Sequence, residues 1–553
     1  MQRLPLGIQT FSELRNGDYL YVDKTEVIHR LITSGKPFFL ARPRRFGKSL
    51  LVSTLAEIFR GNKQFFEGLA IYDKWDWSKK HPVIHIDWSI ASFSTVDELK
   101  RGYKEIILRI ARNYGVAVAP ENPSIYNLSE ALYRKYNEQV AVLIDEYDKP
   151  LHEAIVADDK NLFGQVKQFL HEVYTPLKSC DPYLKFLFLT GISKYAGISI
   201  FSTLNNLTDI SLDERYSTIC GYTQEELESN FKEHIDALTL SRTPPQSREQ
   251  ILASIKKWYN GYSWDGKTSL YNPLSTLLLF DTKDFENYWF TTATPSFLLK
   301  ILAKKKRLGI ALGETVVRSL VSTTDDPYKI AEETLFFQTG YLTIKEIRQT
   351  PEGGKLFALD FPNREVRESF SRSLLAEYGQ YDENKSDILR EKLEAQLLAS
   401  DSVALSATLR SLLAWIPYKL IIQREFYYHS ILLLWLRLLG FNITAEVSTN
   451  LGIIDAVWEL NDQIFVAEIK YAKPSKIKDP SKGKKPANNK NTLTARSVKA
   501  LDKLLAAAFV QIEEKRYPER YKTENKKIKA LAIACSGREV KCEIREIEEV
   551  KEI

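Results

Sequence analysis

The sequence predicts an α/β protein of several domains: a parallel-sheet domain first, then a helical middle region with a winged-helix-like element, and a small α/β domain last. Three observations support this prediction. The chain has 553 residues, enough for three or four domains of roughly 100–200 residues each. Short apolar runs alternate with longer helical patterns in residues 36–220. Helical patterns dominate the middle of the chain, and strand patterns return after about residue 420.

Composition indicates folded domains and excludes several classes of protein. Hydrophobic residues make up 44% and charged residues 27% of the chain, which excludes general disorder. The four scattered cysteines and seven histidines argue against a secreted disulfide scaffold and a zinc ribbon. The first residues lack a signal-peptide core, and the most lipid-like stretch, residues 431–441, is short and contains an arginine. We therefore expect a cytoplasmic protein that does not enter a membrane.

The first domain is expected to contain a buried parallel sheet. Runs that are apolar on both faces, and that are separated by helical patterns, suit parallel strands joined by helical crossovers. The runs are FFLA (38–41), VIHID (83–87), VAVLID (140–145) and LKFLFLT (184–190).

Helical patterns follow this domain. A helix is predicted to begin at Thr223, because Thr223 can cap it and Glu226 completes a capping box. Residues 335–361 contain two strand-like pieces around a Pro/Gly turn, an order compatible with a winged-helix element. The predicted segments are a parallel-sheet domain at 1–221, a helical lid at 222–362, a helical connector at 363–419 and the last domain at 420–553.

A turn ending in Gly47-Lys48-Ser49 joins the first apolar run to a helical pattern. These residue types suit a phosphate-binding loop: glycine lets the backbone close around a phosphate, lysine reaches the terminal phosphates, and serine binds magnesium. The full pattern has another glycine five residues before Gly47, where this chain has Arg42. The alternative interpretation is a chance turn with the same triplet.

A second half-motif lies at the ends of later apolar runs. Asp145 can hold the water shell of a magnesium ion, and Glu146 can polarise an attacking water. Alternatively, both acids only cap the next segment. Thr190 ends another run, as a γ-phosphate sensor or as an ordinary strand-end hydroxyl. Two half-motifs in this order favour ATP binding. Three arginines are candidates to stabilise transition-state charge, and the sequence does not choose among them: Arg44, Arg45 and Arg215.

Longer phrases carry a family resemblance. RPRRFGKSLL, LIDEYDKPL, FLTGISKYAGISIFSTLNNLTDISLDERY and WYNGYSW with LYNP resemble the AAA-ATPase-like family of bacterial proteins, in which a modified P-loop ATPase is joined to a C-terminal PD-(D/E)XK nuclease domain. The resemblance covers nearly the whole chain. It implies an ASCE-type ATPase, and the missing first glycine belongs to the family's own pattern. Such ATPases often place an arginine across a subunit boundary, so a homo-oligomer is an open expectation. The resemblance also implies that Lys48 and Ser49 bind phosphate and magnesium and that Asp145-Glu146 is the Walker B pair. The other candidate nucleotide-binding residues, taken from the motifs themselves, are Arg44, Arg45, Gly47 and Thr190.

The stretch GIIDAVWELNDQIFVAEIKYA is predicted to form a hairpin. With a two-residue turn at Asn461-Asp462, Asp455 lies directly opposite Glu468, and Lys470 projects from the same face. The other face then collects the apolar residues Ile454, Ala456, Trp458, Leu460, Phe465, Ala467, Ile469 and Tyr471.

The acid pair is a candidate metal site. Two carboxylates within about 5 Å of each other destabilise a hairpin unless a divalent cation or Lys470 compensates, so a salt-bridged patch is the alternative interpretation. Two oxygen ligands with free positions for water and phosphate suit Mg²⁺ or Mn²⁺. The lysine would orient or deprotonate the attacking water, and the metal would stabilise charge on the scissile phosphate.

The surrounding residues resemble the PD-(D/E)XK nuclease fold, a restriction-endonuclease-like α/β domain. EFYYHSILLLWLRLLGF resembles its first helix, which implies a metal-supporting role for Glu425. AFVQIEEKRY resembles the helix after the ExK strand, which implies that Gln511, and with it Tyr517, lies near the active site. A solvated helix face is the alternative for Glu425 and Gln511. Residues 473–490 hold seven lysines, which either neutralise nucleic-acid phosphates without sequence preference or form a solvated linker.

Three functional hypotheses follow. The first is an enzyme that binds or hydrolyses ATP and cleaves nucleic acid, with DNA favoured over RNA by analogy with the fold. The second is a nucleotide-switched protein that binds nucleic acid or protein without cutting it. The third is a nuclease whose P-loop is degenerate.

Overall fold

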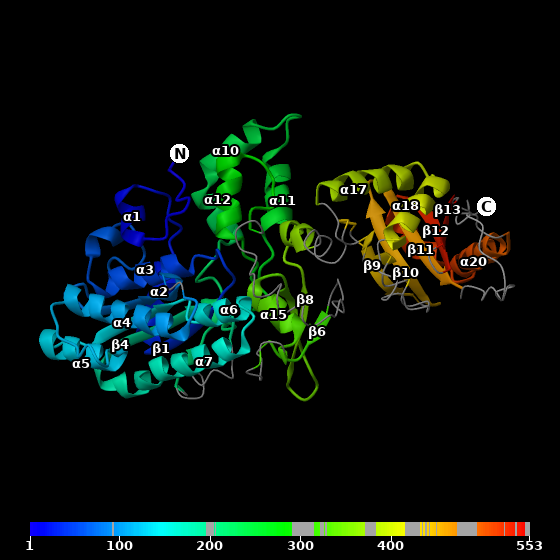
Figure 1. Ribbon diagram of the computed structural model, residues 1–553. Coiled ribbons are helices and arrows are strands. Elements are labelled where there is room, and N and C mark those ends of the chain that lie inside the picture. The colour runs from blue at the N-terminus through cyan, green and yellow to red at the C-terminus, as the bar shows by residue number, and fades with distance from the viewer. Residues whose placement is uncertain are drawn as a thin grey trace, which may run out of the picture. The chain divides into compact units, whose positions relative to one another are not determined.

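The computed structural model divides into two compact units, Met1–Arg367 (the N-terminal unit) and Glu368–Ile553 (the C-terminal unit). Figure 1 shows the helices and strands of both units. None of the helices in the described ranges combines the length and the apolar character needed to cross a membrane. The described residues are 1–90, 93–194, 204, 206–289, 315–320, 326, 329–370, 383–414, 428, 432–433, 435–436, 439–441, 443–449, 451–472, 495–524, 526–536 and 539–547.

A five-stranded parallel sheet forms the core of the N-terminal unit, in the order β2-β3-β4-β1-β5. The four predicted apolar runs all form strands of this sheet, and β4 lies between β1 and β3, paired in parallel with both. A short fifth strand at its edge was not predicted. The strands are β1 (Pro37–Ala41), β2 (Val83–Asp87), β3 (Val140–Asp145), β4 (Leu184–Gly191) and β5 (Thr208–Asp209).

Helices supply the crossovers between these strands, as the apolar runs predicted. Helix α3 packs against β3 and against α1. Helix α4 packs against α5 and α7, and Figure 1 shows these three helices together beside the sheet. The α-helices are α1 (Phe11–Asn16), α2 (Thr25–Ser34), α3 (Lys48–Phe59), α4 (Val96–Asn113), α5 (Ile125–Tyr136), α6 (Lys149–Val156) and α7 (Lys160–Tyr174). The 3₁₀ helices are η1 (Lys63–Phe66), η2 (Trp88–Ile90), η3 (Thr175–Tyr183) and η4 (Glu214–Tyr216).

The middle region begins as predicted, with a capping box at Thr223 and Glu226. The same Glu226 carboxylate also accepts two hydrogen bonds from Lys24 Nζ, at 2.7 and 2.6 Å, which ties the helical region to the start of the chain. The predicted hairpin forms, with a third strand added to give the order β6-β8-β7. Its elements are α9 (Gln224–Asn230), α10 (Lys232–Leu240), α11 (Arg248–Tyr259), α12 (Pro273–Thr282), α15 (Glu332–Thr339), β6 (Thr315–Val317), β7 (Thr343–Gln349) and β8 (Lys355–Asp360).

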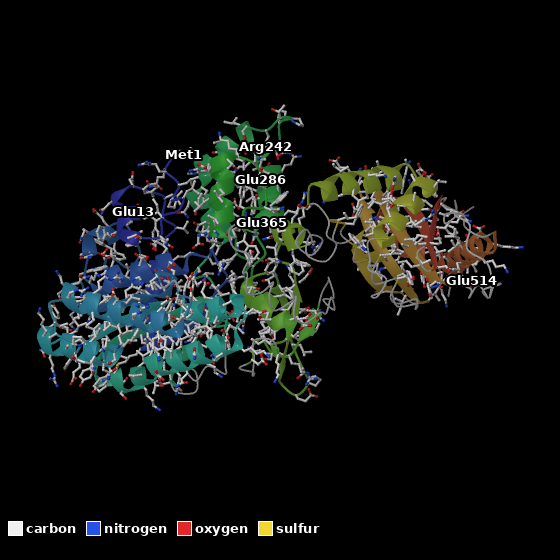
Figure 2. All side chains as sticks on the ribbon, viewed as in Figure 1. Met1, Glu13, Arg242, Glu286, Glu365 and Glu514 are labelled. Atoms are coloured by element: carbon white, nitrogen blue, oxygen red, sulfur yellow. The ribbon has the colours of Figure 1, made fainter. Side chains whose placement is uncertain are left out.

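A buried carboxyl group, Glu365, lies in this middle region (Figure 2). It accepts a hydrogen bond from the backbone N–H of Trp289 at 2.6 Å and from Ser275 Oγ at 2.9 Å. Burial raises the pKa of Glu365 to about 8, against the smaller opposing effect of these hydrogen bonds. The Trp289 indole in turn donates to the Arg44 carbonyl at 3.2 Å, so this carboxyl group anchors a residue that contacts the P-loop.

Glu365→Gln is expected to raise thermal stability more at pH 9 than at pH 6. The folded state holds a proton on Glu365 that the unfolded state releases above about pH 4.5, so wild-type stability falls as pH rises towards 8. The neutral glutamine escapes this loss and keeps an acceptor oxygen. Thermal melts at both pH values should show the variant's advantage growing by at least about 2 °C. An advantage that does not change with pH would contradict the assignment.

The C-terminal unit is built on a mixed five-stranded sheet, in the order β13-β12-β11-β10-β9. Neighbouring strands are antiparallel except β11 and β12, which pair in parallel. Strands β10 and β11 form the predicted hairpin, and β9, β12 and β13 complete the sheet. The elements are α17 (Glu383–Leu398), α18 (Ser402–Ala414), β9 (Ile443–Ser448), β10 (Ile453–Leu460), β11 (Gln463–Tyr471), α20 (Ala495–Glu514), η7 (Tyr517–Glu524), β12 (Lys527–Ser536) and β13 (Glu539–Glu546).

Helix α18 covers the edge strand β13. The backbone N–H groups of Cys542 and Ile544 donate to the hydroxyls of Ser406 and Ser402, at 2.8 and 3.0 Å. Backbone N–H groups on the outer side of an edge strand have no neighbouring strand to bond to, and these two are satisfied by serine hydroxyls instead. Helices α17 and α18, predicted as a connector, belong to the same compact unit as this sheet. The four-segment division remains a prediction.

Candidate nucleotide and metal sites

The P-loop joins β1 to α3, as predicted. Gly47 immediately precedes the helix with a φ of 87°, in the left-handed region that favours glycine. A Cβ built at Gly47 would meet no atom within 4 Å. Open space therefore lies beside the first backbone N–H groups of α3, where an anion such as phosphate is favoured.

Lys48 is held against the loop rather than extended into solvent. It is 6% exposed, and its Nζ donates to the carbonyls of Arg42 and Pro43, both at 2.9 Å. Burial lowers the pKa of Lys48, while the Glu146 and Asp145 carboxylates oppose this shift. Because a phosphate oxygen carries a negative charge and a carbonyl oxygen only a partial one, the Lys48 ammonium is attracted more strongly to a phosphate than to its present partners.

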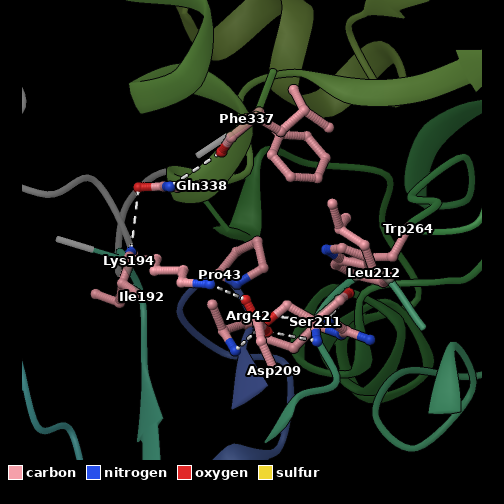
Figure 3. A pocket seen from close by; sticks show the side chains of 12 residues that line it. Arg42, Pro43, Ile192, Lys194, Asp209, Ser211, Leu212, Trp264, Phe337 and Gln338 are labelled. Carbon is pink, nitrogen blue, oxygen red and sulfur yellow. Dashed lines mark hydrogen bonds and ion pairs between the residues drawn. The ribbon is translucent and has the colours of Figure 1, made fainter. Parts of the chain in front are cut away.

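Arg42, which stands where the generic pattern has a glycine, is 1% exposed. Its Nη1 donates to the Ser211 carbonyl at 2.8 Å, and its guanidinium lies 4.1 Å from the centre of the Trp264 ring. Figure 3 shows it lining a pocket that Trp264, Asp209 and Lys194 also line. The arginine side chain is thus used in packing, while its carbonyl contacts Lys48, so the loop accommodates the missing glycine.

The sheet brings the acids to the same edge as the P-loop, because the carboxyl ends of parallel strands meet there. Asp145 is the last residue of β3, and its Oδ1 accepts hydrogen bonds from Thr190 Oγ1 and from the Glu146 N–H. Thr190 reaches Asp145 because β4 is the neighbouring strand. Glu146 has a φ of 53°, a conformation that ordinary residues adopt rarely and that occurs at functional sites.

The remaining predicted residues differ in their surroundings. Ser49 is half-buried at the start of α3, beside Lys48. Arg44 and Arg45 both lie in the loop between β1 and α3, where Arg44 is half-buried and Arg45 is exposed. Arg215 is exposed and ion-paired with Asp213 at 2.6 Å. The structure therefore places two of the three candidate arginines in the P-loop and the third in a local salt bridge.

Asp148, a buried acid three residues after Asp145, was not predicted as a site residue. Its carboxylate accepts hydrogen bonds from the N–H groups of Ile192 and Ser193. Burial raises the pKa of Asp148 to about 7. The only local signal was an aspartate just before a helical pattern, which a capping role explains equally well.

The predicted hairpin is present in the C-terminal unit. Leu460 pairs with Gln463 and Ala456 with Ala467, the last pair of the ladder. Asp455 and Glu468 are the next residues of the two strands, and their charges interact. Lys470 Nζ donates to Glu468 Oε1 at 2.9 Å.

Asp455 and Glu468 occupy different environments. Asp455 is half-buried, and its Oδ2 accepts a hydrogen bond from the Ile469 N–H at 2.7 Å. Glu468 is 1% exposed, and its Oε2 has no hydrogen-bond partner among the described residues. Burial and then the charge of Asp455 raise the pKa of Glu468 to about 7, while Lys470 opposes the shift. A buried oxygen without a partner, beside a second carboxylate, fits a divalent cation.

Other predicted members of this site are only partly described. No group of three His, Cys, Asp or Glu side chains suited to a metal occurs within the ranges described above. Glu425, predicted as a supporting acid, lies outside the described residues, as does the lysine-rich segment 473–490. Gln511 Nε2 donates to the Tyr517 hydroxyl at 3.3 Å, and that hydroxyl donates to the Ile453 carbonyl at 2.8 Å. Gln511 is thus linked to β10 two residues before Asp455.

Both faces of the hairpin are buried, although the sequence analysis named only one. The predicted apolar face is buried at Ala456, Trp458 and Phe465. The face that carries the acids continues into Val457 and Val466, which pack in one core cluster with residues of α20. The acid pair therefore lies at the end of a covered surface, which explains why Glu468 is so strongly shielded from solvent.

Metal affinity at this pair is expected to fall as the pH drops below about 7. Glu468 must lose its proton to bind a cation, and its pKa of about 7 places that loss near neutrality. The dissociation constant for Mn²⁺ should rise about tenfold per pH unit below 7. Calorimetry from pH 5.5 to 8.5 measures it, with Glu468→Gln as the control that removes the titrating group. An affinity that is constant over this range would contradict the expectation.

These features define two classes of fold. A parallel sheet with β4 inserted between the P-loop strand and the acid-bearing strand is that of an ASCE-type P-loop ATPase domain, and the mixed C-terminal sheet is nuclease-like. Residues 5–201 match the family model described as "Predicted AAA-ATPase", and residues 423–544 match that of the "PD-(D/E)XK nuclease superfamily". The chain is 35% identical over 479 residues to "Uncharacterized protein in vnfD 5'region" from Azotobacter chroococcum mcd 1, an alignment covering 85% of this chain and 89% of that protein. The chain therefore belongs to the family of predicted AAA-ATPases that carry a C-terminal PD-(D/E)XK nuclease superfamily domain.

Proposed function

We propose that this protein binds and hydrolyses ATP and cleaves phosphodiester bonds in nucleic acid, with DNA as its substrate. The observation that carries the proposal is the pair of neighbouring carboxylates Asp455 and Glu468, with Lys470 bonded to Glu468. One buried oxygen of Glu468 has no hydrogen-bond partner in the part of the chain that the structure describes. A purely structural salt bridge gives no reason for the second carboxylate, whose charge raises the cost of burying Glu468.

The C-terminal residues have distinct roles in this proposal. Asp455 and Glu468 hold a divalent cation, Mg²⁺ or Mn²⁺, which would neutralise charge on the scissile phosphate. Lys470, less buried than Glu468, orients the attacking water and accepts or returns a proton at Nζ. Gln511 supports β10 through Tyr517. The lysines of segment 473–490 add phosphate contacts that carry no sequence preference.

The N-terminal residues bind and hydrolyse the nucleotide. Lys48 exchanges its two carbonyl partners for phosphate oxygens, while Ser49 and Asp145 hold the magnesium ion. Glu146 polarises the attacking water, and Thr190 lies beside Asp145 where it can sense the γ-phosphate. Arg44 and Arg45, both in the P-loop, supply positive charge near the phosphates.

A paired assay tests both activities and their coupling. Cleavage of plasmid, linear and single-stranded DNA is measured with Mg²⁺ or Mn²⁺, with and without ATP, and ATP turnover is measured with and without DNA. We expect metal-dependent cleavage and ATP turnover, with each activity changed by the other's ligand. Binding of DNA and ATP with neither activity would instead support a nucleotide-switched binding protein. Cleavage without turnover would support a degenerate P-loop.

A further inference from the structure

The end of strand β4 is held by the residues that follow the Walker B acids. Tyr147 donates from its N–H to the Thr190 carbonyl at 2.9 Å and from its hydroxyl to the Ser193 carbonyl at 2.8 Å. Asp148 accepts from the N–H groups of Ile192, at 3.1 Å, and Ser193, at 2.7 Å. Two consecutive residues, through the backbone and side chain of Tyr147 and the side chain of Asp148, therefore hold carbonyl and amide groups of the segment 190–193.

Asp148 makes these bonds in place of a helix cap. It is the N-cap residue of α6, a position where aspartate usually accepts a hydrogen bond from the N–H groups of its own helix. Its side chain makes no such bond. The carboxylate is 1% exposed and instead receives two amides that lie 44 and 45 residues away in the sequence. A buried carboxylate is costly unless hydrogen-bonded. These two amides, together with His152 Nε2 at 3.4 Å from Oδ2, surround the Asp148 carboxylate with polar partners.

The packing around this segment leaves no room for a side chain at Gly191. A Cβ built at Gly191 would lie 2.6 Å from the Tyr147 ring and 2.7 Å from Asp148 Oδ1. Both distances are too short for real carbon contacts. Gly191 directly follows Thr190, whose hydroxyl donates to Asp145. The segment continues to Lys194, whose N–H donates to Gln338 Oε1 at 3.4 Å (Figure 3).

We propose that Asp148 is a positioning residue for ATP hydrolysis: by holding the amides of Ile192 and Ser193, it sets Thr190 against Asp145 and so fixes the acid pair. This inference rests on the proposed ATPase function. Asp148 acts on the acid side of the site, at the ends of β3 and β4. The phosphate-binding residues Gly47 and Lys48 lie at the junction of β1 and α3. The charge of Asp148 acts on Lys48, but removing this negative charge takes no positive group away from the phosphates. Loss of Asp148 is therefore expected to slow hydrolysis without weakening nucleotide binding.

The test compares Asp148→Ala, Asp148→Asn and Gly191→Ala with wild type, using the full chain, ATP as ligand and Mg²⁺ present. We expect Asp148→Ala to lower kcat about 10- to 100-fold, with the Kd for ATP within about twofold of wild type. Asp148→Asn should recover part of kcat, because its amide oxygen still accepts an N–H. Gly191→Ala should reproduce the kcat loss by displacing the same segment. Glu153→Gln, an exposed acid on α6, is the matched control and should leave kcat unchanged.

The possible results distinguish failure of the proposed role of Asp148 from failure of the proposed ATPase function. A kcat for Asp148→Ala within twofold of wild type overturns the proposal, as does a loss of ATP affinity that accounts for the whole effect. If thermal melts show that Asp148→Ala does not fold, Asp148→Asn and Gly191→Ala decide on the same criteria. If the wild-type protein binds ATP but does not hydrolyse it, the proposed ATPase function is overturned, and the proposed role of Asp148 is overturned with it. If the wild-type protein turns over ATP and all three variants have the same kcat, only the proposed role of Asp148 is overturned.

Discussion

Replacing Asp455 with alanine is expected to reduce metal-dependent DNA cleavage by at least about 100-fold. The change removes one of two facing carboxylates and leaves Glu468 to bind a cation alone. Lys470→Ala is expected to lower kcat by roughly 10²- to 10⁴-fold, the usual contribution of a positioned proton-transfer group, while metal affinity is largely kept. Cleavage is measured on plasmid, linear and single-stranded DNA with Mg²⁺ and with Mn²⁺.

Glu459→Gln supplies the matched control. Glu459 lies on the same strand as Asp455 but is exposed and ion-paired with Lys526 at 2.7 Å. Its replacement removes an acid from β10 without touching the facing pair, so cleavage should be unchanged. Metal-dependent cutting that persists at wild-type rates in both Asp455→Ala and Lys470→Ala would eliminate the assignment of this site.

At the nucleotide site, Lys48→Ala and Glu146→Gln are expected to fail in different ways. Lys48→Ala removes a charged donor to the phosphates, a loss of about 1.5–3 kcal/mol, so ATP should bind about 10- to 100-fold more weakly. Glu146→Gln keeps the size of the side chain but not its charge. It should bind ATP normally, with kcat about 10²- to 10⁴-fold lower. Calorimetry and a phosphate-release assay measure the two quantities.

Lys36→Ala is the control for the lysine variant. Lys36 immediately precedes β1, at the end of the strand opposite the P-loop, and is exposed. Its loss should alter neither binding nor turnover. Wild-type turnover no higher than that of Glu146→Gln would refute hydrolysis at this site and leave nucleotide binding as its function.

The hairpin register could be predicted because its determinants are local. The turn at Asn461-Asp462 and the alternation of apolar residues on both sides fix which residues face each other, and Asn461 has the positive φ that such a turn requires. The same alternation did not show that both faces are covered, because that depends on α20, which begins more than twenty residues later. The strands of the parallel sheet were likewise visible as apolar runs, but periodicity reports burial and not which strands are neighbours. The insertion of β4 between β1 and β3 was not predicted.

The missed contacts at the nucleotide site all join residues far apart in the sequence. Arg42 was noted as a missing glycine, but its packing on Trp264 and Ser211 depends on segments about two hundred residues away. Asp148 was not predicted as a site residue, and its partners Ile192 and Ser193 lie just beyond β4, the next strand in the chain. A buried acid takes its role from where the backbone donors around it lie in space, and no local pattern carries that information.

The covering of β13 by α18 bears on how the nuclease-like part can be isolated. A truncated polypeptide beginning at residue 420 would lack Ser402 and Ser406, leaving the amides of Cys542 and Ile544 without their hydroxyl partners. An uncovered edge strand of this kind pairs with strands of other molecules, so the truncated polypeptide would aggregate. A polypeptide beginning at residue 368 retains its own cover, and is the natural starting point for expressing this half by itself.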